Sequence, residues 1–265
     1  MIMNKKVSLT ILGSCSGTEP MPGRHHASWA MDYDGRLYWF DAGESCSHTA
    51  HVAGMDLPSI ECIFISHTHM DHVGGLPNLL WTLRKLSSVS PEARSRLSGR
   101  SIRVFIPDLD VYEGITRLLR GTEGGFRTLF DLKPSRCEDG VLYEEHGVKV
   151  IAQHNYHVND SEPFLSFSFR VEAGGKSIVY SGDVKSIADF ETLIPGADLL
   201  LMETGHHDVV EVCRRLKASG LDFGQLVFTH HGRKILRDAD GELAKARQVL
   251  GDKVLLAFDG MSMAL

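Results

Sequence analysis

The chain has few cysteines and no pair of them at the spacing that thiolate metal sites use. Five cysteines are scattered over 265 residues, and no C-x-x-C sequence occurs. This absence argues against a zinc finger or zinc ribbon. An odd number of widely spaced cysteines is typical of reduced, mostly buried thiols, so we expect a cytoplasmic protein.

Long hydrophobic runs and an excess of positive charge are also missing. No stretch approaches the roughly 18 apolar residues of a membrane-spanning helix, and residues 1–13 lack the apolar core of a signal peptide. With 28 Lys and Arg against 34 Asp and Glu, the formal net charge is −6. We therefore expect no membrane partner and no strong general affinity for nucleic acid.

Histidine is abundant, with 14 residues, and the densest group is the run "HTHMDH" over residues 67–72. His67 and His69 alternate along the chain and can point the same way, while Asp71 and His72 follow on the next turn. Imidazole nitrogens and carboxylate oxygens are ligands of zinc and similar metals. The run therefore predicts two neighbouring metal ions, one bound by His67 and His69 and the other by Asp71 and His72.

Hydrophobic patterning predicts an α/β fold over a single domain, residues 1–265. Strands that form hairpins are followed by strands that alternate with helices, and the second half repeats this order. Residues 87–101 are polar and predict a surface loop, with a short insertion or a helix as the alternatives. Strands are predicted over 7–13, 60–66, 102–107, 148–157, 197–203 and 224–230, in hairpins over 26–43 and 164–183, and helices over 74–87, 108–120, 186–193, 208–218 and 241–250.

Further polar residues lie where predicted strands end, which is where α/β proteins form their sites. They are His154 or His157, Asp183, and His230 or His231. A carboxylate can bridge two cations, and Asp183 follows an apolar strand and a glycine, so it is well placed for that role.

The run "HTHMDH" resembles the H-x-H-x-D-H signature of the metallo-β-lactamase superfamily, and Asp41 in "WFDAGE" resembles that family's first motif. The resemblance implies an αβ/βα four-layer sandwich of two mixed β-sheets flanked by helices. It favours His157 over His154 and His230 over His231, because these match the family's remaining motifs. It implies two divalent metal ions, with Zn²⁺ suited to the ligands and Mn²⁺ or Fe as alternatives. The implied ligands are His67, His69, Asp71, His72, His157, Asp183 and His230.

Within the superfamily the chain is most similar to the ribonuclease Z-like branch. The opening "ILGSCSGTEPMPGRHHAS", the segment "DAGE", and "LLLMET" with Glu203 carry the likeness. A histidine near a helix start belongs to the same pattern, which His207 fits, with His206 beside it. The chain lacks the Gly- and Pro-rich arm of the tRNA-processing members, so we expect a small phosphodiester or an RNA end as substrate. The branch also implies a homodimer.

These features predict a dinuclear metal-dependent hydrolase, namely a phosphodiesterase in which metal-activated hydroxide attacks phosphorus. Asp71 is expected to bind metal and accept the water's proton, while Glu203 orients His207 as general acid. Asp41 is expected to accept the second N–H of a ligand histidine. The alternative is an acyl hydrolase that cleaves a thioester, lactone or lactam on the same scaffold.

Overall fold

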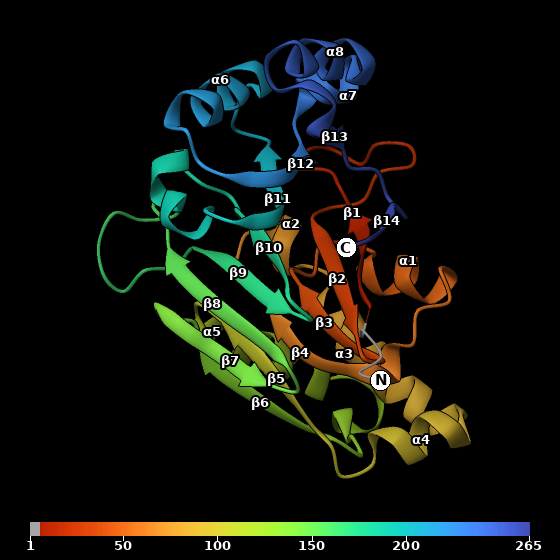
Figure 1. Cartoon of the computed structure of the whole chain (residues 1–265). Helices are drawn as coiled ribbons and strands as arrows, with labels where there is room; N and C mark the ends of the chain where they lie inside the picture. The colour runs from red at the N-terminus through yellow and green to blue at the C-terminus, as the bar shows by residue number, and fades with distance from the viewer. Residues whose placement is uncertain (1–5) are drawn as a thin grey trace, which may run out of the picture.

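The computed structural model of the protein describes residues 6–265. It places the strands in two sheets that face each other, as Figure 1 shows. Five residues of the N-terminal segment in which we expect no signal peptide lie outside the described residues. In the described part of the chain, no helix is long and apolar enough to cross a membrane.

The first sheet contains the N-terminal half of the chain and one short strand from its end. Its antiparallel strands come first along the chain, and β3 then begins a parallel run through β4 and β5 to β6. In spatial order the strands are β14 (Ser262–Ala264), β1 (Val7–Gly13), β2 (Ser28–Tyr33), β3 (Arg36–Phe40), β4 (Ile60–Phe64), β5 (Ser101–Ile106) and β6 (Asp131–Arg136).

The second sheet repeats this order with the second half of the chain. Strands β7 to β10 are antiparallel neighbours, and β10 then begins a parallel run through β11 and β12 to β13. In spatial order the strands are β13 (Val254–Leu256), β12 (Phe223–His231), β11 (Ala197–Thr204), β10 (Lys176–Tyr180), β9 (Phe167–Ala173), β8 (Val148–His154) and β7 (Gly140–Glu145).

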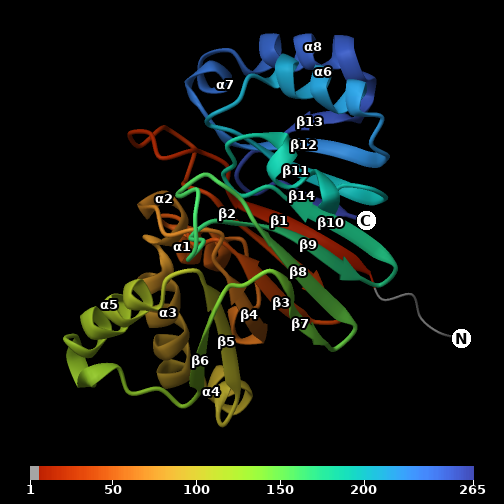
Figure 2. The same ribbon diagram turned by 90° about the vertical axis from the view of Figure 1, so that its left-hand side faces the viewer.

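Helices cover the outer face of each sheet. Figure 2 shows α6 and α8 over the second sheet and α3, α4 and α5 on the side of the first. The helices are α1 (Cys46–Val52), α2 (Met70–Val73), α3 (Leu76–Val89), α4 (Pro91–Leu97), α5 (Leu109–Arg120), α6 (Val209–Ser219), α7 (Arg233–Arg237) and α8 (Ala239–Leu250). Separate apolar clusters fill the space between the sheets and the space under each helical layer. The predicted four-layer αβ/βα sandwich of two mixed sheets is therefore confirmed.

An aromatic ladder crosses four strands of the first sheet on its inner face. Trp29 and Phe40 stack with ring centroids 4.1 Å apart. Phe40 stacks on Phe64 at 4.9 Å, and Phe64 stacks on Phe105 at 5.0 Å. The rings are cross-strand neighbours in register, so the sheet itself sets their spacing. The ladder ends directly before the segments that carry Asp41 and the histidine run.

Several local predictions were wrong in extent. Residues 87–101 are not a loop, because α3 continues to Val89 and α4 follows, so the helix alternative is confirmed. The Ser90 hydroxyl accepts a hydrogen bond from Ala93 N at 3.1 Å, which starts α4. Strand β8 ends at His154, so residues 155–157 lie beyond it. Residues 186–193 form two 3₁₀ turns, Ile187–Asp189 and Glu191–Leu193, instead of an α-helix.

Four strands were missed because their sequences carry little pattern. The strands β6 and β7 lie at the free edges of the sheets and are mostly exposed, and β6 contains Pro134. Edge strands of this kind lack the apolar alternation of a half-buried strand. The strands β13 and β14 have three residues each, too few to show a period.

Phe64→Ala should lower the free energy of unfolding by about 3–5 kcal/mol, because it removes the ring at the centre of the ladder. Urea unfolding followed by tryptophan fluorescence measures the change. Leu118→Ala is the control, because Leu118 is 62% exposed on α5. Equal losses in both variants would mean that the ladder does not stabilise the fold.

Candidate metal centre

The histidine run lies where β4 leaves the first sheet. His67 pairs across to Ser166 of the second half, and α2 is a single turn that carries Asp71 and His72. Gly75 follows α2, at the point where the chain packs against the loop after β3. A Cβ at Gly75 would lie only 2.0 Å from the Gly43 carbonyl oxygen. Glycine is needed there for close backbone approach, which lets the run turn into α3.

The other predicted ligands reach the same place from the second sheet. His157 lies three residues beyond the end of β8, Asp183 lies three residues beyond the end of β10, and His230 is the last residue but one of β12. These strands run in one direction, so their C-terminal ends share one edge. The structure thus brings together all seven sequence-predicted ligands.

The first ligand cluster contains His67, His69, His157 and Asp183. His67 Nε2 and His157 Nε2 lie 3.1 and 3.3 Å from His69 Nδ1. Asp183 Oδ2 lies 3.7 Å from His67 Nε2 and 3.6 Å from His157 Nε2. One ligand atom from each of the four residues lies within 4.8 Å of the others, which suits a single cation.

The second ligand cluster contains Asp71, His72, Asp183 and His230. Asp71 Oδ2 lies 3.0 Å from His230 Nε2 and 3.6 Å from His72 Nε2. Asp183 Oδ1 lies 3.3 Å from both His72 Nε2 and His230 Nδ1. Asp183 therefore turns one oxygen to each cluster, which is the arrangement of a bridging carboxylate.

Three atoms of the second cluster are buried without a hydrogen-bond partner. They are His72 Nε2, Asp183 Oδ1 and His230 Nδ1. A buried polar atom without a partner costs free energy, so each such atom requires an explanation. Divalent metal binding explains all three at once, because these are imidazole and carboxylate donors turned toward a common point. The residues present therefore fit the metal that the donor set implies.

The pKa values of the second cluster reflect its density of charge. Burial alone would lower the pKa of His72, but the carboxylates of Asp183 and Asp41 raise it well above its ordinary value. Asp183 likewise raises the pKa of His230 to about 9 against the effect of burial. Burial would raise the pKa of Asp71, but a hydrogen bond from His230 and the charge of His72 hold it below its usual range. Protons and a metal cation thus compete for one set of atoms.

Asp41 accepts hydrogen bonds from the segment that carries the ligand run. It is fully buried, and its Oδ2 accepts hydrogen bonds from His72 Nδ1 at 2.8 Å, Ser66 Oγ at 2.8 Å and Tyr180 OH at 2.7 Å. Its Oδ1 accepts from Ser66 N at 2.6 Å. The contact with His72 is the one that the sequence predicted for Asp41. A carboxylate on Nδ1 fixes the tautomer of His72 and directs Nε2 into the cluster.

Neighbouring histidines that the sequence could not separate have different surroundings. His154 pairs with Asp139 at 2.6 Å and stacks on Phe164. His154 therefore lies outside the cluster that contains His157. His231 is buried and contacts the Ala257 carbonyl oxygen at 2.8 Å through Nε2, and burial lowers its pKa to about 3.

Glu203 lies beside the clusters and contacts both candidate acid histidines. Its Oε1 lies 3.1 Å from His206 Nδ1 and 3.4 Å from His207 Nε2. Its Oε2 accepts from the His206 backbone N–H at 2.9 Å. His206 also joins a third group with Glu203 and His230. The sequence favoured His207, yet His206 lies closer to the ligands, at 3.8 Å from Asp183 Oδ2.

No feature of the sequence indicated Ser66 or Tyr180 as part of the site. These residues lie 25 and 139 positions from Asp41 along the chain. Neither belongs to a pattern that indicates a carboxylate partner, so only the folded chain shows their contacts.

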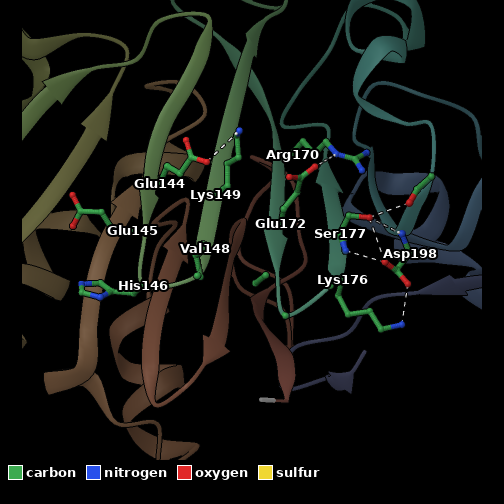
Figure 3. A pocket seen from close by; sticks show the side chains of 15 residues that line it. Glu144, Glu145, His146, Val148, Lys149, Arg170, Glu172, Lys176, Ser177 and Asp198 are labelled. Atoms are coloured by element: carbon green, nitrogen blue, oxygen red, sulfur yellow. Dashed lines mark hydrogen bonds and ion pairs between the residues drawn. The ribbon is translucent and has the colours of Figure 1, made fainter. Parts of the chain in front are cut away.

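A hollow of about 760 Å³ lies at the ends of the second sheet's strands that are opposite the ligand clusters (Figure 3). The turns between β7 and β8 and between β9 and β10 line it, and it is rich in charge. Its cations are paired within the rim, as in Lys149 with Glu144 and Lys176 with Asp198. These surface pairs satisfy one another, so the hollow carries no chemistry comparable to the metal centre.

Two facing mixed sheets with histidine and carboxylate ligands at one edge define a metal-binding domain of the metallo-β-lactamase type. The chain belongs to the β-lactamase superfamily, because the model of the β-lactamase superfamily domain matches residues 36–232. That range includes all seven candidate ligands.

Known proteins resemble this chain over different lengths. Ribonuclease Z from Treponema pallidum is 38% identical over 89 residues, which cover 34% of this chain and 28% of that enzyme. Ribonuclease Z from Shouchella clausii is 24% identical over 306 residues, covering 96% of this chain and 95% of that enzyme. The fold matches the crystal structure of the metallo-β-lactamase fold protein YhfI from Bacillus subtilis. That comparison gives a TM-score of 0.74 and 18% identity over 98% of this chain and 100% of that one.

Asp41→Asn should weaken Zn²⁺ binding by about 10- to 100-fold, because an amide cannot accept the hydrogen bonds of His72, Ser66 and Tyr180 together. Competition with a chromophoric chelator measures the affinity. Asp139→Asn is the control, since it alters another short carboxylate–histidine pair, 2.6 Å against 2.8 Å for Asp41 and His72, that lies outside the clusters. Similar losses in the two variants would remove the special role of Asp41.

Proposed function

We propose that the protein is a dinuclear metal-dependent phosphodiesterase. The observation that carries this proposal is Asp183, a buried carboxylate with one oxygen toward each of two ligand clusters. Two divalent ions held by these clusters, with Zn²⁺ favoured by the ligand types, would activate water and neutralise charge on the phosphate oxygens. The similarity to ribonuclease Z enzymes favours phosphorus over carbonyl chemistry.

Asp71 is positioned to act as the proton acceptor. Its side chain is partly exposed, unlike those of His72 and His230, so it can face bound substrate. Its lowered pKa keeps it an anion near neutral pH. In the proposed reaction the water oxygen bonds to phosphorus and one of its protons passes to Asp71.

His206 is the general acid that the contacts favour. Its hydrogen bond to Glu203 raises its pKa, and its ring lies 4.8 Å from the ring of His157 with 46% of the side chain exposed. His207 instead donates from Nε2 to the Val184 carbonyl oxygen at 2.9 Å. The Nε2 proton of His207 is therefore already in a hydrogen bond within the protein. As the bond between phosphorus and the leaving oxygen breaks, His206 gives its proton to that oxygen.

The first experiment is hydrolysis of bis(p-nitrophenyl) phosphate by metal-loaded protein, beside an aryl thioester and a precursor tRNA. We expect diester turnover with about two metal ions per chain. His157→Ala should lose both the turnover and one metal ion, because it removes a ligand of the first cluster.

His146→Ala is the control and should retain both properties, because His146 lies in the turn between β7 and β8, at the end of the second sheet opposite the clusters. Thioester turnover without diester turnover would replace the proposal with the acyl hydrolase. Precursor tRNA cleavage would assign an RNA end as substrate, and its absence would assign a smaller diester.

His206→Ala should lower kcat for the diester by about 10²–10⁴-fold, the usual contribution of a general acid. The wild-type rate should fall as pH rises past the raised pKa of His206, because the acid must be protonated. This alkaline limb should disappear in His206→Ala and persist in His207→Ala. The opposite result would return the role to His207.

A further inference from the structure

A small hollow of about 390 Å³ opens directly beside the ligand clusters. Its walls come from three segments, residues 156–160, 184–185 and 206–207. His157 and His206 both line it, and their ring centroids lie 4.8 Å apart. A group attached to a phosphate at the clusters, on the side of His206, would therefore extend into this hollow.

One wall of the hollow is apolar and partly open to solvent. Tyr156 and Val158 lie two residues apart in the chain, and each is 38% exposed. Lys185 and Asp160 also line the hollow, and Lys185 Nζ contacts Asp160 Oδ1 at 3.1 Å. The hollow thus offers an aromatic and an aliphatic surface next to a polar reaction centre, which is the usual composition of a small-molecule site.

Tyr156 is held in place by a chain of hydrogen bonds. Asp139 is an acceptor and lies 2.6 Å from His154 Nδ1, so His154 carries its proton there. His154 Nε2 is then free to accept from the Tyr156 hydroxyl at 3.3 Å. The His154 ring is itself stacked on Phe164 with centroids 3.8 Å apart. These contacts direct the tyrosine hydroxyl toward His154.

The loop behind the hollow is also tied down. The Asn159 side chain donates to the carbonyl oxygens of Ser161 and Pro163 and accepts from Leu165 N at 3.1 Å. Val158 N donates to Ser166 Oγ at 3.3 Å. A wall that is ordered in advance costs little conformational entropy when a ligand binds.

We propose that Tyr156 is a stacking platform for a nucleobase on the leaving-group side of the scissile phosphate. The substrate class is then a nucleoside phosphodiester, because a nucleobase is the flat aromatic group that biological phosphodiesters carry. The hollow has room for one nucleoside rather than for a folded RNA surface. This inference rests on the proposed function, which puts the phosphate at the clusters and the leaving oxygen at His206.

Binding tests the platform without catalysis. Metal-loaded wild-type protein should bind adenosine 5′-monophosphate about 5- to 100-fold more tightly than ribose 5-phosphate, the range that base stacking on an aromatic side chain supplies. Tyr156→Ala should abolish this preference, and Tyr156→Phe should keep most of it because the ring remains. Calorimetry measures the affinities. A wild type that does not distinguish the two ligands, or a Tyr156→Ala variant that still does, would overturn the platform.

Kinetics then assign the side of the phosphate. The substrates are a 3′,5′-dinucleoside phosphate and two analogues, each lacking one of the two bases. Tyr156→Ala should lower kcat/KM for the dinucleoside and for the analogue that keeps the leaving-side base. It should leave the other analogue unchanged. Equal effects on all three substrates would contradict the assignment.

The two proposals fail in different ways. If the wild type hydrolyses no diester, including bis(p-nitrophenyl) phosphate, the proposed function fails, while the binding comparison still decides whether Tyr156 stacks on a base. If diesters are hydrolysed but the bases make no difference, only the platform fails. Thermal melting of Tyr156→Ala should match the wild type, because the side chain is partly exposed.

Discussion

The buried carboxylate of Asp183 is the group around which the whole site is arranged. Burial alone would raise its pKa, yet His230 and His72 lower it, so the carboxylate stays ionised in the interior. An uncompensated charge at this depth would be very costly, which means that the surrounding imidazoles and any bound cations are required partners. The ends of the strands from both sheets converge on this one side chain.

Hydrogen bonds of residues that are not themselves ligands help to join the two halves of the sandwich. Tyr180 comes from the second sheet, and it donates to Asp41, which follows the last strand of the N-terminal hairpin. Near the C-terminus, Asp259 accepts from both the backbone and the hydroxyl of Ser14. Most of the interface between the sheets is apolar, and apolar contacts are non-directional. These polar contacts are directional, so they fix how the two sets of ligands meet.

The contrast between the two described hollows shows how chemistry is confined to one end of the strands. At the far end, the charged side chains of the turns pair with one another (Figure 3). At the ligand end, buried histidine and carboxylate atoms are left without hydrogen-bond partners, and a tyrosine is held beside them. Partnered charges stabilise a surface, whereas buried unpartnered donors and acceptors are suited to bind something else.

The sequence by itself determined the ligand run and the strands that lead into the site. Four ligands lie within six positions, so local backbone geometry is enough to group them, and apolar runs of strand length place the remaining carboxylate and histidines at strand ends. The likeness to known motifs then separated His157 from His154, although β8 stops earlier than its apolar run suggested.

Only the tertiary structure decided which neighbours act together. It set His206 rather than His207 closest to the ligands, bound Asp41 to Tyr180, and opened the hollow beside Tyr156. The side-chain directions of consecutive residues in a turn depend on backbone angles that the whole fold imposes. Contacts between residues more than a hundred positions apart depend on how the two sheets pack. Neither the side-chain directions in a turn nor these long-range contacts follow a period or a spacing that can be read along a single sequence.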